Sequence, residues 1–299
     1  MKRIFQGLFT AAGVALLTFL ALRVVPGDPV ELMLGESSQF ADRELMRQKL
    51  GLDLSLGRQF LTFVTGLTHG DLGSSIVTGR PVTATISAAI PHTFSLALAI
   101  ALFANLIGIP LGVIAAFRSA KISGQVLFYV TALLIAVPSF WLAPVLILAF
   151  GLHWPWLPIT RSGELGHYVL PVLASGIGLS AYFMQTTRAA ISECLQQDYV
   201  RTAIGKGAST MRVLFVHALP NAAIPLITVS ALQFGYLLSG SVIIETIFEW
   251  PGLGKLTKDA IQSRDYPIVQ GAVLVIALIY VTLNTITDLL NTWLRSKRS

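Results

Sequence analysis

Six stretches of the sequence are apolar over about 20 or more residues, and none carries a charge in its central third. The hydrocarbon core of a bilayer is about 30 Å thick and a helix rises about 1.5 Å per residue, so such stretches can span it. Only 12% of the 299 residues are charged, which is too little to cover a soluble surface. The sequence therefore predicts an all-α membrane protein with six transmembrane helices, at residues 4–25, 93–117, 126–150, 169–190, 222–246 and 268–290.

The first apolar run is expected to stay in the membrane. A signal peptide has a short apolar region that ends in a small-residue cleavage site. Here the run continues to about residue 25 and ends in Pro26-Gly27-Asp28-Pro29. We expect residues 1–25 to form the first helix, residues 26–92 an outer segment with short helices near 42–50 and 59–67, and residues 93–299 a five-helix core.

Basic residues cluster at the ends of the apolar runs, which predicts an orientation rather than nucleic-acid binding, despite the net charge of +6. The termini and the loops 118–125 and 191–221 are rich in Lys and Arg, whereas the loops 151–168 and 247–267 hold few. The positive-inside rule then places both termini and residues 191–221 in the cytoplasm and residues 26–92 outside.

The sequence has no recognisable catalytic pattern. It contains no phosphate-binding loop of the Walker type and no metalloprotease or nucleophile-elbow motif. Its five histidines are scattered and Cys194 is the single cysteine, so we predict no catalytic residue and no metal site.

Three polar residues within the spans are candidates for a solute pathway. Gln185 and Gln233 could line it or hydrogen-bond between helices, and Glu245 could face it or lie at the wet interface.

The loop 191–221 is the most informative segment. Asp198 can begin a short helix, Gly207 breaks it, and Ser209 can cap a second one. Val200, Ala203 and Ile204 fall on one face of the first helix, and Met211, Leu214, Phe215 and Ala218 share a face of the second. Two short amphipathic helices around a glycine corner suit either a helix laid in the groove of a partner or a loop that hugs the membrane.

The same residues resemble the permease subunits of bacterial ABC importers, in the dipeptide, oligopeptide and nickel branch. That family has E-A-A, three residues, Gly, nine residues, a large residue and x-L-P. This chain has Arg201-Thr202-Ala203, Gly207, His217 and Leu219-Pro220 at the same spacing, with Arg201 in place of the family's Glu. Further matches of the peptide branch are P-G-D-P at 26–29, L-G-L-D at 50–53, G-D-L-G-S-S at 70–75, E-W-P-G-L-G at 249–254 and R-D-Y-P-I-V-Q at 264–270. Two departures, Leu54-Ser55 after L-G-L-D and an ending without L-D-P-R, leave the subfamily open.

The resemblance implies the fold of a type I ABC importer permease in a bacterial cytoplasmic membrane. It also implies partners: a second homologous permease, two cytoplasmic ATPases that bind ATP and Mg, an external substrate-binding protein, and membrane lipid. No cofactor and no nucleic acid would bind this chain. Residues 198–220 would couple to an ATPase through Asp198, Tyr199, Arg201, Thr202, Ala203, Gly207, His217, Leu219 and Pro220.

The predicted function is import of dipeptides or oligopeptides by alternating access. A nickel or metal chelate, or glutathione, is the alternative substrate within the same family. A secondary carrier is a weaker alternative, because the spans show neither charged pairs at mid-depth nor evident inverted repeats.

Overall fold

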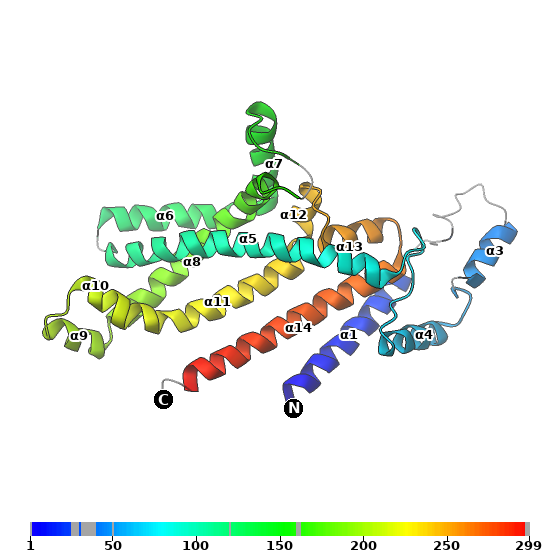
Figure 1. Cartoon of the computed structure of the whole chain (residues 1–299), viewed down its shortest axis with the longest axis horizontal. Coiled ribbons are helices and arrows are strands. Elements are labelled where there is room, and N and C mark those ends of the chain that lie inside the picture. The colour runs from blue at the N-terminus through cyan, green and yellow to red at the C-terminus, as the bar shows by residue number, and fades with distance from the viewer. Residues whose placement is uncertain are drawn as a thin grey trace. The chain divides into compact units, whose positions relative to one another are not determined.

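The computed structural model describes residues 2–24, 30, 40–49, 51–119, 121–159 and 163–296, and these are mainly helical (Figure 1). One isolated antiparallel bridge, between Ser74 and Pro81, is the β-structure found in this part of the chain. The helices are α1 (Lys2–Val24), α3 (Phe40–Lys49), α4 (Leu56–Thr68), α5 (Val82–Phe117), α6 (Ile122–Ala136), α7 (Ser139–Leu146), the π-helix η1 (Ile147–His153), α8 (Gly166–Leu195), α9 (Asp198–Gly205), α10 (Thr210–Arg212), the π-helix η2 (Val213–Ala218), α11 (Leu219–Gly240), α12 (Val242–Ile247), α13 (Leu253–Gln262) and α14 (Tyr266–Ser296).

The membrane-spanning prediction is confirmed for four helices. Helices 82–117, 166–195, 210–239 and 266–290 are each long and apolar enough to cross a bilayer. Helix α1 covers the first predicted span, but its apolar stretch, Phe9–Val24, is shorter than the length that a span usually needs. The third predicted span, residues 126–150, differs from the prediction because it is not one straight helix.

The third span is broken at Val137 and Pro138. Helices α6 and α7–η1 meet there at 91°, and both residues are extended, with ψ of 116° and 137°. Proline has no N–H for the helical ladder, and its ring disfavours the helical conformation of the preceding residue. Beyond the bend, Trp154 and Trp156 stack at 5.9 Å and are exposed, as aromatic side chains at a membrane interface are. The chain therefore turns sharply here, and the predicted third span consists of two helical pieces instead of one straight helix.

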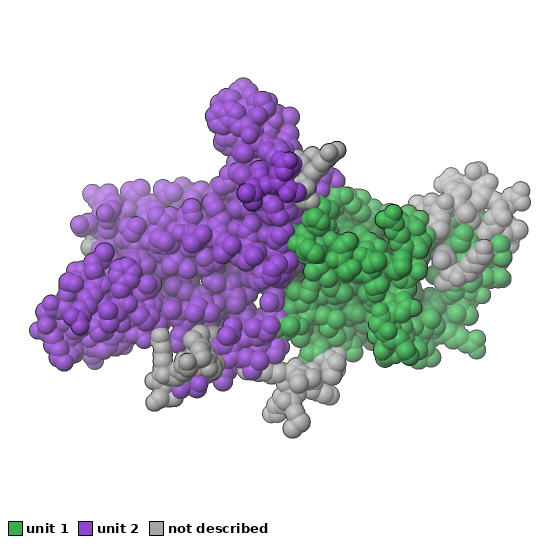
Figure 2. Space-filling view, in the orientation of Figure 1, with its two compact units in different colours: residues 1–93, 239–246, 251–282 green, residues 94–238, 247–250, 283–299 purple. Residues whose placement is uncertain are grey.

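The chain divides into two compact units, coloured separately in Figure 2. The first comprises residues 1–93, 239–246 and 251–282, and the second comprises residues 94–238, 247–250 and 283–299. In the first unit the beginning of α5, helix α13 and the beginning of α14 share one apolar core. Its buried members are Val82, Ile86, Ala89, Leu253, Ala260, Ile268, Val269 and Ala272.

A buried aspartate joins the end of α13 to the loop that precedes α5. Arg264 ends α13 in a left-handed conformation, with φ of 54°, and the N–H of Asp265 then donates to the carbonyl of Ala260 at 2.8 Å. The Asp265 carboxylate accepts from the Ser75 hydroxyl and, at 3.1 Å, from the backbone N–H of Ile76. Both side chains are buried, at 4% exposure. The loop 73–82 is thus fixed by a residue 190 positions away from Ser75.

Within the second unit, two glycines let α5 approach α8. A Cβ added at Gly112 would lie 2.6 Å from the carbonyl oxygen of Met184 and 2.5 Å from Cβ of Thr187. One turn earlier, a Cβ at Gly108 would lie 2.5 Å from the carbonyl oxygen of Ser180. Small residues four apart are a common means of bringing membrane helices into backbone contact. These two glycines therefore allow the close approach of α5 and α8.

We expect Gly112→Ala to destabilise the folded chain by about 1–3 kcal/mol, because an added methyl group has no room between the two backbones. Gly178→Ala is the matched control, since the nearest atom to its added Cβ would be 3.6 Å away. Thermal unfolding of the detergent-purified protein measures both. Equal melting temperatures for the two variants would contradict the close α5–α8 contact.

Candidate functional site

The predicted coupling residues form a compact corner, here called the corner segment, residues 198–220, all within the second unit. Helix α9 ends as its glycine predicts. Gly207 has φ of 82°, its N–H donates to the carbonyl of Ile204 at 2.9 Å, and the N–H of Ala208 donates to the carbonyl of Ala203 at 3.0 Å. This pair of hydrogen bonds is the Schellman closure of a helix, which favours glycine at the left-handed position. Gly207 therefore fixes the direction in which the chain leaves α9.

The second arm of the corner begins at Ser209, as predicted. The Ser209 hydroxyl accepts from the backbone N–H of Arg212 at 3.3 Å, which caps the new helix. The predicted short second helix is wrong in its extent, however. From Thr210 the chain continues through the π-helical turn η2 and α11 to Ser239 as one helix. Pro220 cannot donate to a carbonyl one turn earlier, and the wider π-turn directly before it accommodates the proline without ending the helix.

Buried apolar contacts hold the corner to the rest of its unit. Val200 and Ala203 of α9 pack on Val213 of η2. Leu214 and Ala218 pack against Ile191 of α8 and Ala222 of α11. Of the seven apolar residues that the sequence groups on the two faces, four are buried: Val200, Ala203, Leu214 and Ala218. The corner is therefore anchored by its small and branched residues, with Ile204, Met211 and Phe215 left outside.

Those three apolar side chains are exposed, although the sequence groups each of them on a face with residues that are buried. Ile204 is 58% exposed, Met211 65% and Phe215 58%. Met211 and Phe215 lie about one turn apart, and Ile204 stands on the neighbouring helix α9. Figure 1 shows α9 and α10 together at one end of the second unit. We call Ile204, Met211 and Phe215 the exposed ridge.

The polar residues of the corner are mostly in water. Asp198 and Arg201 approach to 3.8 Å, but their side chains are 98% and 74% exposed, so the pair contributes little to stability. The Thr202 hydroxyl donates to the carbonyl of Asp198 at 2.9 Å, within α9. Tyr199 is exposed, His217 and Leu219 are partly buried, and Pro220 is exposed. The predicted coupling residues are thus brought together, and their charged and aromatic members face outward.

The predicted pathway residues are not brought together by what the structure describes. Gln185 is partly buried, and its amide donates to the Thr131 hydroxyl at 3.4 Å. This hydrogen bond joins α8 to α6, which is the second of the two roles that the sequence allows for Gln185. Gln233 is partly buried on α11. Glu245 belongs to the first unit, is 0% exposed, and lies neither at a wet interface nor on an open surface.

Glu245 instead forms a buried clamp that the sequence did not reveal. Its Oε1 accepts from the hydroxyls of Thr93 and Ser241, both at 2.7 Å, and its Oε2 accepts from the backbone N–H of Lys255 at 3.0 Å. The Thr93 hydroxyl also accepts from the N–H of Leu253 at 2.7 Å. These contacts tie α5, α12 and α13 together through one carboxylate. A buried carboxylate persists only with such donors around it.

An apolar groove of about 550 Å³ lies between α5 and α11 in the second unit. Its walls include Leu98, Leu102, Ile227 and Phe234. Among the described residues that line the groove, Ser230 and Asn105 form the one hydrogen-bonded polar pair. The Ser230 hydroxyl donates to Oδ1 of Asn105 at 2.7 Å. The groove can hold apolar side chains or acyl chains far better than a charged solute.

The described residues thus combine long apolar helices with an anchored corner that carries an exposed ridge. Comparisons identify the family. Residues 108–299 match the model of the binding-protein-dependent transport system inner membrane component, and residues 1–97 match the model of the N-terminal part of such components. The chain belongs to this family and is a permease subunit of the ABC importer type.

Relatives of known name cover nearly the whole chain. It is 37% identical to the glutathione transport system permease protein GsiC of Pectobacterium atrosepticum, over 97% of this chain and 95% of that protein. It is 39% identical to the di/tripeptide transport system permease protein DppB of Pseudomonas aeruginosa, over 94% of this chain and 92% of that protein.

Two solved transporters share the fold. The inward-facing MetNI methionine ABC transporter matches with a TM-score of 0.57 at 14% identity, over 71% of this chain and 97% of that chain. An amino acid ABC transporter crystallised with histidines matches with a TM-score of 0.51 at 18% identity, over 72% and 94%. The predicted fold of a type I importer permease is therefore confirmed.

We expect Glu245→Gln to lower the free energy of unfolding by about 2 kcal/mol or more. The new amide N–H₂ would replace one carboxylate oxygen, so a donor that now has an acceptor would point at another donor. Glu164→Gln is the control, since Glu164 is exposed. Denaturant or thermal unfolding in detergent measures the loss. A variant that stays as stable as wild type but transports poorly would show that Glu245 acts on the solute instead.

Proposed function

We propose that this chain is one half of the translocation unit of an ATP-driven importer, and that its corner segment docks in a groove of a cytoplasmic ATPase. The exposed ridge carries this proposal. Three large apolar side chains stand in water at a corner whose neighbours are firmly packed, and such a surface suits burial in a partner's groove.

Coupling then follows from how rigidly the corner is held. Val200, Ala203 and Leu214 pack it against its own unit, so it moves with those helices rather than as a loose loop. ATP and Mg bind to the ATPases, whose closure pulls on the ridge. The spans respond by opening the pathway alternately to either side of the membrane.

The remaining partners follow from the family. They are a second homologous permease, a second ATPase and an external substrate-binding protein. The segment 26–92 and the loop 247–267 would receive the binding protein, with both termini and the corner segment in the cytoplasm.

We infer that apolar side chains of the second permease, rather than the solute, cover the groove between α5 and α11, because its lining offers one polar pair to a peptide. Gln185 and Gln233 remain the pathway candidates.

Short peptides are the substrate class that we propose. The named relatives transport di- and tripeptides or glutathione, and glutathione is itself a peptide-like solute. A nickel chelate is the second possibility within the family, and no described group of His, Cys, Asp or Glu could hold a metal ion on this chain.

We expect the double variant Met211→Glu/Phe215→Glu to lower the affinity of the ATPase for the permease at least tenfold, because two charges would have to be buried in the groove. Thr210→Glu, also exposed and in the same segment, controls for added charge. Co-purification of the ATPase with the permease measures docking, and peptide-stimulated ATPase activity with the cognate binding protein measures function. Unchanged docking in the double variant would refute the ridge as the coupling surface.

Gly207→Ala tests the corner itself. It should reduce peptide-stimulated ATPase activity severalfold, because alanine at φ of 82° costs about 1–2 kcal/mol and shifts the direction of α10. Gly205→Ala is a matched control: a Cβ has open space at both glycines, and of the two only Gly207 has a positive φ. Equal coupling in the two variants, with equal membrane insertion, would remove the role assigned to the corner geometry.

A further inference from the structure

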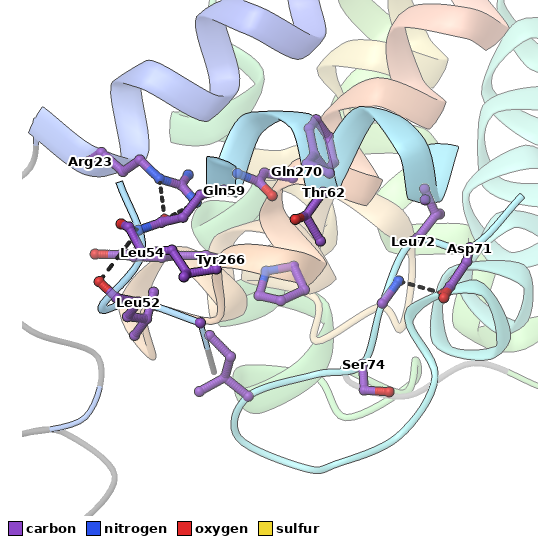
Figure 3. A pocket seen from close by; sticks show the side chains of 16 residues that line it. Arg23, Leu52, Leu54, Gln59, Thr62, Asp71, Leu72, Ser74, Tyr266 and Gln270 are labelled. Carbon is purple, nitrogen blue, oxygen red and sulfur yellow. Dashed lines mark hydrogen bonds between the residues drawn. The ribbon is translucent and has the colours of Figure 1, made fainter. Parts of the chain in front are cut away.

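A pocket of about 400 Å³ lies in the first unit, remote in sequence from the corner segment. It is bordered by the end of α1, by α4, by the loop 71–76 and by the beginning of α14 (Figure 3). Polar side chains on its wall include Arg23, Gln59, Thr62, Tyr266 and Gln270. No residue of the corner segment or of the groove between α5 and α11 lines it.

Arg23 presents its positive charge to this pocket. Its Nε and Nη2 donate to Oε1 of Gln59 at 3.0 and 2.9 Å, and its Nη1 donates to the carbonyl of Phe19 at 3.1 Å. The guanidinium also lies 3.4 Å from the ring centre of Phe19. These acceptors are all neutral, and no carboxylate forms an ion pair with Arg23 among the described residues. A guanidinium has five N–H donors, and among the described residues only three of them meet an acceptor, which leaves two for a ligand.

Gln59 holds Arg23 in place without neutralising it. Its Nε2 donates to the carbonyls of Leu52 at 3.3 Å and Leu54 at 2.8 Å, which turns its oxygen toward Arg23. A glutamate here would have made an internal ion pair, whereas the amide leaves the positive charge for another group. Asp71 lines the pocket too, but Figure 3 places it at the opposite end from Arg23, where it accepts from the N–H of Gly73 at 2.8 Å.

Gln270 supplies a second donor without an acceptor. It lies on the pocket wall, is only 6% exposed, and its Nε2 has no hydrogen-bond partner. A buried amide N–H₂ in that state is unfavourable unless a ligand satisfies it. Arg23 and Gln270 thus both line the pocket and both have N–H donors to offer, one set charged and the other neutral.

The position of the pocket indicates the source of a ligand for these donors. Arg23 stands at the end of the apolar helix α1, and Tyr266 is the first residue of the apolar helix α14. Ends of membrane helices lie at the level of the lipid headgroups, where arginine and tyrosine are common. The rest of the wall is largely apolar and includes Leu52, Phe63, Leu72, Ile76 and Pro267.

We propose that this pocket binds an oxyanion, the phosphate of a phospholipid headgroup, with Arg23 and Gln270 as its donors. The apolar wall covers the glycerol and the first carbons of the acyl chains. Bound lipid joins α1 and α4 to the beginning of α14 and so fixes the N-terminal helix on its unit.

The test uses the complete importer complex in detergent, stripped of lipid. Native mass spectrometry measures binding of dioctanoyl phosphatidylglycerol, with inorganic phosphate and dialanine as soluble oxyanions in separate arms. Arg23→Gln and Gln270→Met should each weaken lipid binding about tenfold or more, because each removes a hydrogen bond to a charged group. Arg58→Gln, an exposed arginine on α4, should leave it unchanged.

The melting temperature of Gln270→Met separates a loss of lipid binding from a general loss of stability. Without lipid, its melting temperature should equal or exceed that of wild type, because a buried unpaired donor is removed. With lipid, wild type should gain stability and the variant should not. Lipid binding that is unaffected by both variants would overturn the site, and tighter binding of phosphate or dialanine than of lipid would overturn the lipid as its occupant.

Discussion

The buried carboxylate of Glu245 is the interaction on which the first unit depends. It is closed off from water and receives hydrogen bonds from three separate points of the chain: Thr93, Ser241 and the backbone of Lys255. Gly252 and Gly254 are required beside it, since a Cβ at Gly252 would collide with the carboxylate and one at Gly254 would lie 2.6 Å from Cα of Val242. The E-W-P-G-L-G run therefore has a physical meaning: its glycines make room for a charge that must be surrounded by donors.

Much of the fold was predictable because hydropathy and helix length are local properties. The spans near 93–117, 169–190, 222–246 and 268–290 are helices, and Gly207 and Ser209 end and begin helices as their chemistry requires. The bend at Pro138 was not predictable, because Pro171 and Pro225 remain inside α8 and α11. A proline removes one hydrogen bond, but whether the helix then bends through 91° depends on neighbouring packing that the sequence does not display.

The helix boundaries at Gly207 and Ser209 in the corner segment were predictable, but the exposure of its side chains was not. Periodicity groups apolar positions on a face, yet it cannot say whether that face meets its own core, lipid or a partner. Leu214 is buried while Met211 and Phe215, grouped with it, are exposed. The clamp was hidden for a different reason. Thr93 lies 152 positions from Glu245, so their pairing exists only once the chain has folded.

The continuity of the helix from Thr210 to Ser239 changes how force would travel through the second unit. If a short docking helix were followed by a flexible loop, the loop would bend when the ATPase moved, and little of the motion would reach the apolar segment behind it. One helix of 30 residues, about 45 Å long, would instead move Met211 and Phe215 together with the apolar segment that follows them. This helix bends most easily at the π-turn 213–218 and at Pro220, because its hydrogen bonding is irregular there. In the sequence, Ser241 and Glu245 of the buried clamp follow the end of this helix directly.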